Sequence, residues 1–165
     1  MCRNLACYTD LSNCSQAVQR VAVQRLEILV PVLALACLTL SILVVLGILR
    51  MGGIATGRLP QAYYRLFRHS DDQEPDFLRA ISRNYHNLLE IPVLFYVGCL
   101  VAYTADLVSQ SLVSLAWAYV ALRAVHTAIH VGYNRLSHRM AAFVTSSLVL
   151  IAFWVVLARA FLAQG

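Results

Sequence analysis

The chain has 165 residues, of which 60% are hydrophobic and 13% are charged, and its formal net charge is +5. A soluble domain carries about 25% charged residues, so the composition excludes an ordinary water-soluble domain. All 13 basic residues are arginines, which also excludes a lysine nucleophile and Schiff-base chemistry.

The amino-terminal segment, residues 1–25, is polar and irregular and contains Cys2, Cys7 and Cys14. This segment and the apolar stretch behind it are both too long for a secretory signal peptide. The cysteines lack metal-ligand spacing, and their positions do not define disulfides. We expect residues 1–25 to form a disordered tail and residues 26–165 to form one membrane domain.

Four long apolar stretches follow the tail, at residues 28–49, 88–105, 112–131 and 140–162. About 20 apolar residues let a helix cross the roughly 30 Å hydrocarbon core of a bilayer. Backbone polar groups must be hydrogen bonded within the protein there, and these stretches are too long and too continuously apolar for barrel strands. The sequence therefore predicts an all-α membrane protein built as a bundle of four transmembrane helices.

The second predicted helix carries polar residues at its start. Arg83, Asn87 and Glu90 are spaced i, i+4 and i+7, so they share one helix face. Polar groups inside a membrane are costly and usually mark a functional site. Pro92 follows Glu90 closely. It either kinks the helix and widens the space beside Glu90, or it is a membrane proline without a functional role.

The third predicted helix carries a second polar set near its end. Arg123, His126 and His130 are spaced i, i+3 and i+7 and share another helix face. From the expected helix ends, Glu90 and Arg123 both lie about 12–14 Å into the membrane. We expect an ion pair between them or a short hydrogen-bonded network around it. The alternative is a purely structural network that specifies how the helices pack.

Arginine is concentrated in the first and third connections between the predicted helices and is absent from the second. The positive-inside rule then places the first and third connections in the cytoplasm and both termini outside, although arginines in the amino-terminal tail dilute this bias. Both polar sets, together with Arg139, fall in the cytoplasmic half of the bundle. The net positive charge is explained more simply by membrane orientation than by nucleic-acid binding.

Other chemistries find little support in the sequence. His126 and His130 could hold a metal ion from one helix face, but membrane di-iron oxygenases need many more than the five histidines present. The sequence contains no glycine-rich phosphate loop, no serine nucleophile elbow and no HExxH motif. We therefore expect no metal site and no nucleic-acid partner.

The stretch 83–92, with Arg83, Asn87, Glu90 and Pro92 in fixed spacing, resembles the signature of the MAPEG family, the membrane-associated proteins in eicosanoid and glutathione metabolism. The similarity covers about residues 26–163, including the four-helix layout and the inferred orientation. It is greatest to small bacterial members whose reaction is undefined, which implies a multi-pass protein of a bacterial inner membrane.

The sequence also resembles a second signature of the family. In the prostaglandin E synthase branch, an arginine, a histidine and a tyrosine at this spacing precede a short connection and a second arginine. These positions correspond to Arg123, His126, His130 and Arg139. Two motifs on the expected helices, at the expected separation, make the resemblance fairly specific.

The resemblance implies a homotrimer that binds glutathione between adjacent protomers on the cytoplasmic side. Arg139 would lie near the sulfur as the catalytic cation, because a cation beside a thiol raises the population of the thiolate. A hydrophobic electrophile would enter sideways from the bilayer. The residues that the resemblance assigns to glutathione binding are Arg83, His86, Asn87, Glu90, Arg123, His126 and His130.

The sequence departs from the family pattern at four positions. His130 replaces a tyrosine, Met140 a serine and Phe143 a second tyrosine, and His86 replaces an arginine that often contacts glutathione. Hydroxyl donors that could steady a thiolate are therefore missing. Some family members are non-catalytic lipid-binding partners, so membership does not by itself imply catalysis.

Two functions remain open from the sequence. The first is a glutathione-dependent transferase, peroxidase or isomerase that acts on a hydrophobic electrophile. The second is a non-enzymatic lipid-binding or scaffold protein on the same fold. A proton- or ion-handling role for Glu90, His126 and His130 is disfavoured, because no polar series continues into the outer half of the bundle beyond Tyr103 and Thr104.

Overall fold

The structure, a computed structural model, describes residues 25–59 and 75–163. The expectation of a disordered tail at residues 1–25 falls almost entirely outside these described residues. The elements in chain order are α2 (Leu29–Ala55), α4 (Asp76–Glu90), α5 (Pro92–Thr104), α6 (Gln110–Val131) and α7 (Leu136–Leu162).

Four helical segments within the described residues are long and apolar enough to cross a membrane, which confirms the predicted four-helix bundle. The second segment begins well before its apolar stretch, because α4 is amphipathic and buries one apolar face that includes Leu78, Ile81 and Leu88. The four segments are Arg25–Ala55, Asp76–Thr104, Gln110–Val131 and Leu136–Leu162.

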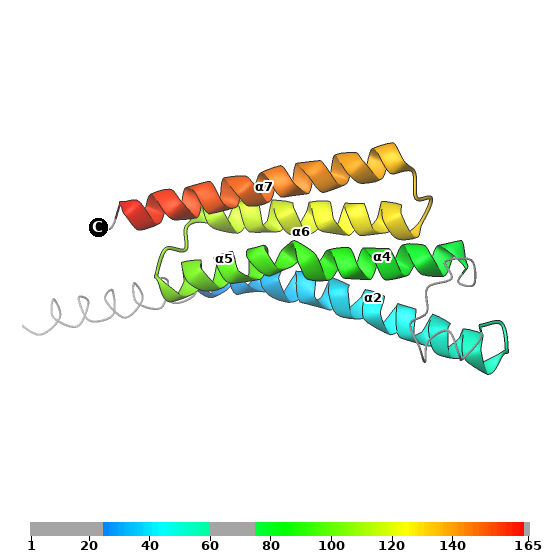
Figure 1. Cartoon of the computed structure of the whole chain (residues 1–165). Coiled ribbons are helices and arrows are strands. Elements are labelled where there is room, and N and C mark those ends of the chain that lie inside the picture. Colours follow the sequence, from blue (N-terminus) through cyan, green and yellow to red (C-terminus); the bar gives the residue numbers. More distant parts are fainter. Residues whose placement is uncertain (1–24, 60–74, 164–165) are drawn as a thin grey trace, which may run out of the picture.

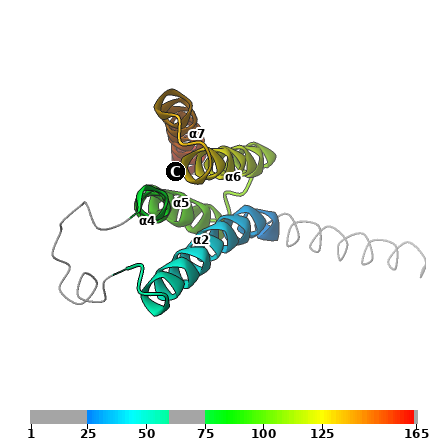
Figure 2. The same ribbon diagram turned by 90° about the vertical axis from the view of Figure 1, so that its right-hand side faces the viewer.

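The helices are arranged around the α4–α5 segment, as Figures 1 and 2 show. Helices α6 and α7 are antiparallel neighbours on one side of it, and α2 lies on the other side. Helix α2 inclines away from the other helices toward its carboxyl end, where the start of α4 and the connection between α6 and α7 also lie (Figure 1). The polar sets of α4 and α6 therefore come to the same end of the bundle.

The boundary between α4 and α5 lies at Pro92. Proline has no N–H to donate to the carbonyl of Leu88, so the hydrogen-bond ladder is interrupted there. Ile91 keeps helical dihedral angles, with a φ of −67° and a ψ of −38°, so the chain does not turn sharply there. The two helices consequently run end to end in Figure 1. Pro92 is buried, and because Ile91 stays helical, the interrupted ladder does not turn the chain away from the bundle.

An aromatic cluster forms the core of the bundle. Phe95 of α5, Tyr119 of α6 and Phe153 of α7 are completely buried. The ring centroid of Phe95 lies 4.9 Å from that of Tyr119 and 6.2 Å from that of Phe153. Gly98 permits the close approach of α5 to α7, because a Cβ atom at this position would lie 2.8 Å from the Phe153 ring. The cluster fixes the three helices that support the polar end.

Candidate functional site

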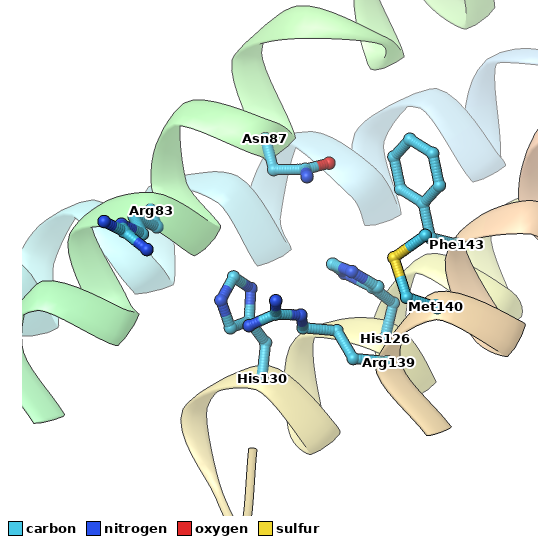
Figure 3. A pocket seen from close by; sticks show the side chains of 7 residues that line it. All are labelled: Arg83, Asn87, His126, His130, Arg139, Met140 and Phe143. Atoms are coloured by element: carbon cyan, nitrogen blue, oxygen red, sulfur yellow. The ribbon is translucent and has the colours of Figure 1, made fainter. Parts of the chain in front are cut away.

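A pocket of about 260 Å³ lies between α4, α6 and α7 at the polar end of the bundle. Figure 3 shows its side chains converging from these three helices on a common space. It brings together residues that are far apart in the sequence. The lining residues are Arg83 and Asn87 from α4, His126 and His130 from α6, and Arg139, Met140 and Phe143 from α7.

The two histidines of α6 contribute buried imidazoles to the pocket. His126 is 2% exposed and His130 is 5% exposed, and their ring centroids are 5.5 Å apart. Nδ1 of His126 and both ring nitrogens of His130 have no hydrogen-bond partner among the described residues. Buried polar atoms without partners are costly. These nitrogens therefore carry unmet hydrogen-bonding capacity in the wall of the pocket.

The charged residues that line the pocket are all cationic. Arg83 and Arg139 line it, and none of its seven lining residues carries a carboxylate. Arg139 donates from Nη1 to Oδ1 of Asn134 at 2.8 Å, which ties its guanidinium to the connection between α6 and α7. A cleft lined by charges of one sign concentrates ions of the other sign. The arrangement is suited to an anionic ligand.

Beside Arg139, the α7 side of the pocket is apolar. Met140 and Phe143 line it, and the Phe143 ring centroid lies 6.0 Å from that of His126. The pocket thus places an apolar wall beside two guanidinium groups and two imidazoles. Its chemistry suits a ligand or a pair of ligands with both an anionic part and an apolar part.

Arg123 lies beside this pocket but does not line it. Its side chain is completely buried, and its Nη2 donates to the backbone carbonyl and to Oδ1 of Asn87, both at 2.8 Å. Nε and Nη1 of Arg123 have no partner among the described residues. Arg123 therefore fixes the Asn87 amide, which does line the pocket, and joins α6 to α4 at this depth.

The predicted ion pair between Glu90 and Arg123 is wrong for the single chain. Glu90 is exposed, and Arg123 bonds to Asn87, one helical turn earlier on the same face. The predicted depth was counted from the expected helix ends, whereas α4 begins at Asp76, well before the apolar stretch that starts at residue 88. Residue spacing gave the correct face of α4, but the helix ends did not give its axial register against α6.

Asn84 is a buried polar residue that the sequence analysis did not identify. It is completely buried, and its Oδ1 accepts a hydrogen bond from Thr127 Oγ1 at 3.4 Å. Asn84 falls in the apolar phase of α4, between Ile81 and Leu88. That position is the signal that could have identified it, because an amide in an apolar helix stripe requires a partner. Like the hydrogen bonds of Arg123 to Asn87, this contact joins α4 to α6.

The structure brings five of the eight predicted site residues into the lining of one pocket. Arg123 lies beside the pocket, while His86 and Glu90 are exposed on α4 and are not among the lining residues. Whether these eight residues bind glutathione stays a prediction. The five that line the pocket are Arg83, Asn87, His126, His130 and Arg139.

Comparisons with known proteins give one informative result. Neither the curated proteins nor the solved structures contain a match to the chain. A protein-family model described as the MAPEG family matches residues 28–159, which include all four membrane-spanning segments apart from three residues at the start of the first and three at the end of the last. Because the match covers most of the sequence, this chain belongs to the MAPEG family and is an integral, multi-pass membrane protein of a family associated with glutathione and eicosanoid metabolism.

Proposed function

We propose that the protein is a glutathione-dependent transferase, peroxidase or isomerase that acts on a hydrophobic electrophile. The observation that carries this proposal is a pocket with two guanidinium groups, two buried imidazoles with unpartnered nitrogens and no carboxylate in its lining. Glutathione is a tripeptide with two carboxylates, one ammonium group, amide groups and a thiol. Its net negative charge and its two carboxylates suit a lining with two guanidinium groups.

The residues that line the pocket have two proposed roles, binding of glutathione and activation of its thiol. Arg83 and Asn87 of α4 are suited to the carboxylate and amide groups of the peptide, and His126 and His130 supply further hydrogen bonds. Arg139 is suited to stand beside the thiol, where a cation favours the thiolate and so raises the population of the nucleophile. Met140 and Phe143 offer an apolar surface to an electrophile that arrives from the bilayer.

We also propose that the functional unit is a homotrimer. His86 and Glu90 are exposed on the single chain, although they share the face of α4 that carries Arg83 and Asn87. A carboxylate that faces acyl chains is costly. A neighbouring protomer that covers this face would remove the cost and would bring both residues to the rim of the pocket. The positive-inside rule supports a cytoplasmic position for this end of the bundle.

A second candidate function is non-catalytic binding of a lipid or a scaffold role. The observation that favours it is the absence of hydroxyl groups from the pocket lining, where Met140 and Phe143 present apolar atoms instead. A lipid with an anionic head group would satisfy the arginines and the apolar wall together. This function predicts lipid that co-purifies with the protein and no conjugation of thiols to generic electrophiles.

Thermal unfolding of the purified protein in detergent, with and without millimolar glutathione, tests the first function. We expect glutathione to raise the unfolding midpoint of the wild type, since a ligand that binds only the folded state stabilises it. Arg139→Met should abolish the shift, because it removes the guanidinium from the pocket while keeping a side chain of moderate volume.

Arg135→Met is the matched control. Arg135 lies four residues before Arg139, is exposed and does not line the pocket, so this variant should keep the shift. An unchanged midpoint of the wild type at millimolar glutathione would contradict the proposed function. A shift that persists in Arg139→Met would contradict the role of Arg139 alone.

A further inference from the structure

Arg139 is held by a residue outside the pocket. Its Nη1 donates to Oδ1 of Asn134 at 2.8 Å, across the connection between α6 and α7. Asn134 is not among the lining residues. A guanidinium has five N–H groups in a rigid fork, so one hydrogen bond to Asn134 leaves others free to face the pocket. This contact sets the direction of the fork before any ligand binds.

The connection itself holds Asn134 in place. The Asn134 N–H donates to the carbonyl of Ile129 at 2.8 Å, and the Gly132 N–H donates to that of Ala128 at 3.0 Å. Asn134 has a φ of +46°, in the left-handed region that asparagine adopts more readily than most residues. The acceptor oxygen is therefore carried by a fixed backbone at the carboxyl end of α6.

A second hydrogen bond crosses the same connection and provides a natural control. The Tyr133 hydroxyl lies 2.9 Å from Nδ1 of His138, and their rings meet edge to face. Both residues are exposed, and neither lines the pocket. Loss of this bond would loosen the connection without removing the partner of Arg139.

We propose that Asn134 is a positioning residue that orients the Arg139 guanidinium toward an anion bound in the pocket. The inference rests on the proposed function for the identity of that anion, but the contact itself does not depend on it. Pre-organised charges bind more tightly, because no side-chain freedom is lost when the ligand arrives. Asn134 would then set affinity for the anion without touching it.

Asn134→Gly is the test variant, because glycine accepts a positive φ without strain and removes only the side chain. We expect its dissociation constant for glutathione to rise about three- to ten-fold, as loss of one hydrogen bond allows. Tyr133→Phe should leave the constant unchanged. An unchanged constant in Asn134→Gly, or a rise of the same size in Tyr133→Phe, would overturn the proposal.

A second measurement does not depend on glutathione. Phenylglyoxal modifies arginine, and peptide mass mapping of the intact membrane protein gives the rate at Arg139. Asn134→Gly should raise this rate relative to wild type and Tyr133→Phe, whereas Asn134→Asp, which keeps an acceptor oxygen, should restore protection. If wild-type protein binds no glutathione, the proposed function fails by itself and the labelling rates decide the inference. Equal labelling in wild type and Asn134→Gly would overturn it.

Discussion

Arg123 shows how a single residue constrains this bundle. A charged side chain near the centre of a membrane helix costs about 2.5–3.5 kcal/mol on insertion scales. Arg123 is nevertheless completely buried, with the Asn87 amide and carbonyl as acceptors instead of a carboxylate. Neutral acceptors satisfy hydrogen bonds without cancelling the charge. The positive field of Arg123 therefore adds to that of the adjacent pocket and favours an anionic ligand.

Removal of the Asn87 side chain should expose the cost of this buried charge. Asn87→Leu takes one acceptor from Arg123 and should lower the free energy of unfolding by about 1–3 kcal/mol. Arg123→Met in the same chain removes the charge that lost its partner and should recover most of that stability. Thermal unfolding without ligand, monitored by tryptophan fluorescence, measures the stability of the single and the double variant. A double variant no more stable than Asn87→Leu would show that the charge is not the source of the loss.

At the scale of the element, packing of α5 against α7 depends on Gly98. The site that a Cβ atom would occupy lies 2.8 Å from Cε1 of Phe153 and 3.3 Å from ring atoms of Trp154. Phe153 is completely buried within the aromatic core and has little room to move. Because α7 carries Arg139, Met140 and Phe143, this distant contact also supports one wall of the pocket.

Gly98→Ala should therefore destabilise the protein by about 1–3 kcal/mol, the usual cost of overpacking a core. Gly47→Ala in α2 is the control, since no atom lies within 4 Å of a Cβ at that position. Alanine has the higher helix propensity, so the control should be neutral or stabilising by up to about 1 kcal/mol. Thermal unfolding of both variants provides the comparison. Equal effects would mean that Gly98 is not needed for close packing.

At the scale of the whole molecule, the pocket lies at the same end of the bundle as the connection between α6 and α7, because its residues Arg139 and Met140 follow this connection in the first turns of α7. Arg135 and Arg139 lie at this end, while Arg25 forms an ion pair with Asp106 near the connection between α5 and α6. The positive-inside rule counts arginines near the ends of the spans. It predicts that the pocket opens toward the cytoplasm, where glutathione is present.

Single cysteines at the two connections test this orientation. In a variant without the native cysteines, Ser137→Cys should react with a membrane-impermeant maleimide only after bacterial spheroplasts are opened. Gln110→Cys, at the start of α6, should react while they are intact. Both positions are exposed in the structure, so accessibility depends on the side of the membrane. The reverse labelling pattern would contradict the predicted orientation and the cytoplasmic pocket.

The sequence by itself determined the local properties of this protein. Long apolar stretches defined the four spans, and the spacing of Arg83 and Asn87 and of His126 and His130 defined the polar helix faces, because hydropathy and the 3.6-residue period depend only on neighbours along the chain.

The tertiary structure alone decided how those faces meet. It paired Arg123 with Asn87 instead of Glu90, and it brought Asn134 to Arg139. Axial register between helices depends on where each helix begins, on contacts such as Gly98 with Phe153, and on hydrogen bonds between distant residues. A helical period specifies the direction of a side chain around its helix but not its height against a neighbouring one, which only packing of the whole bundle fixes.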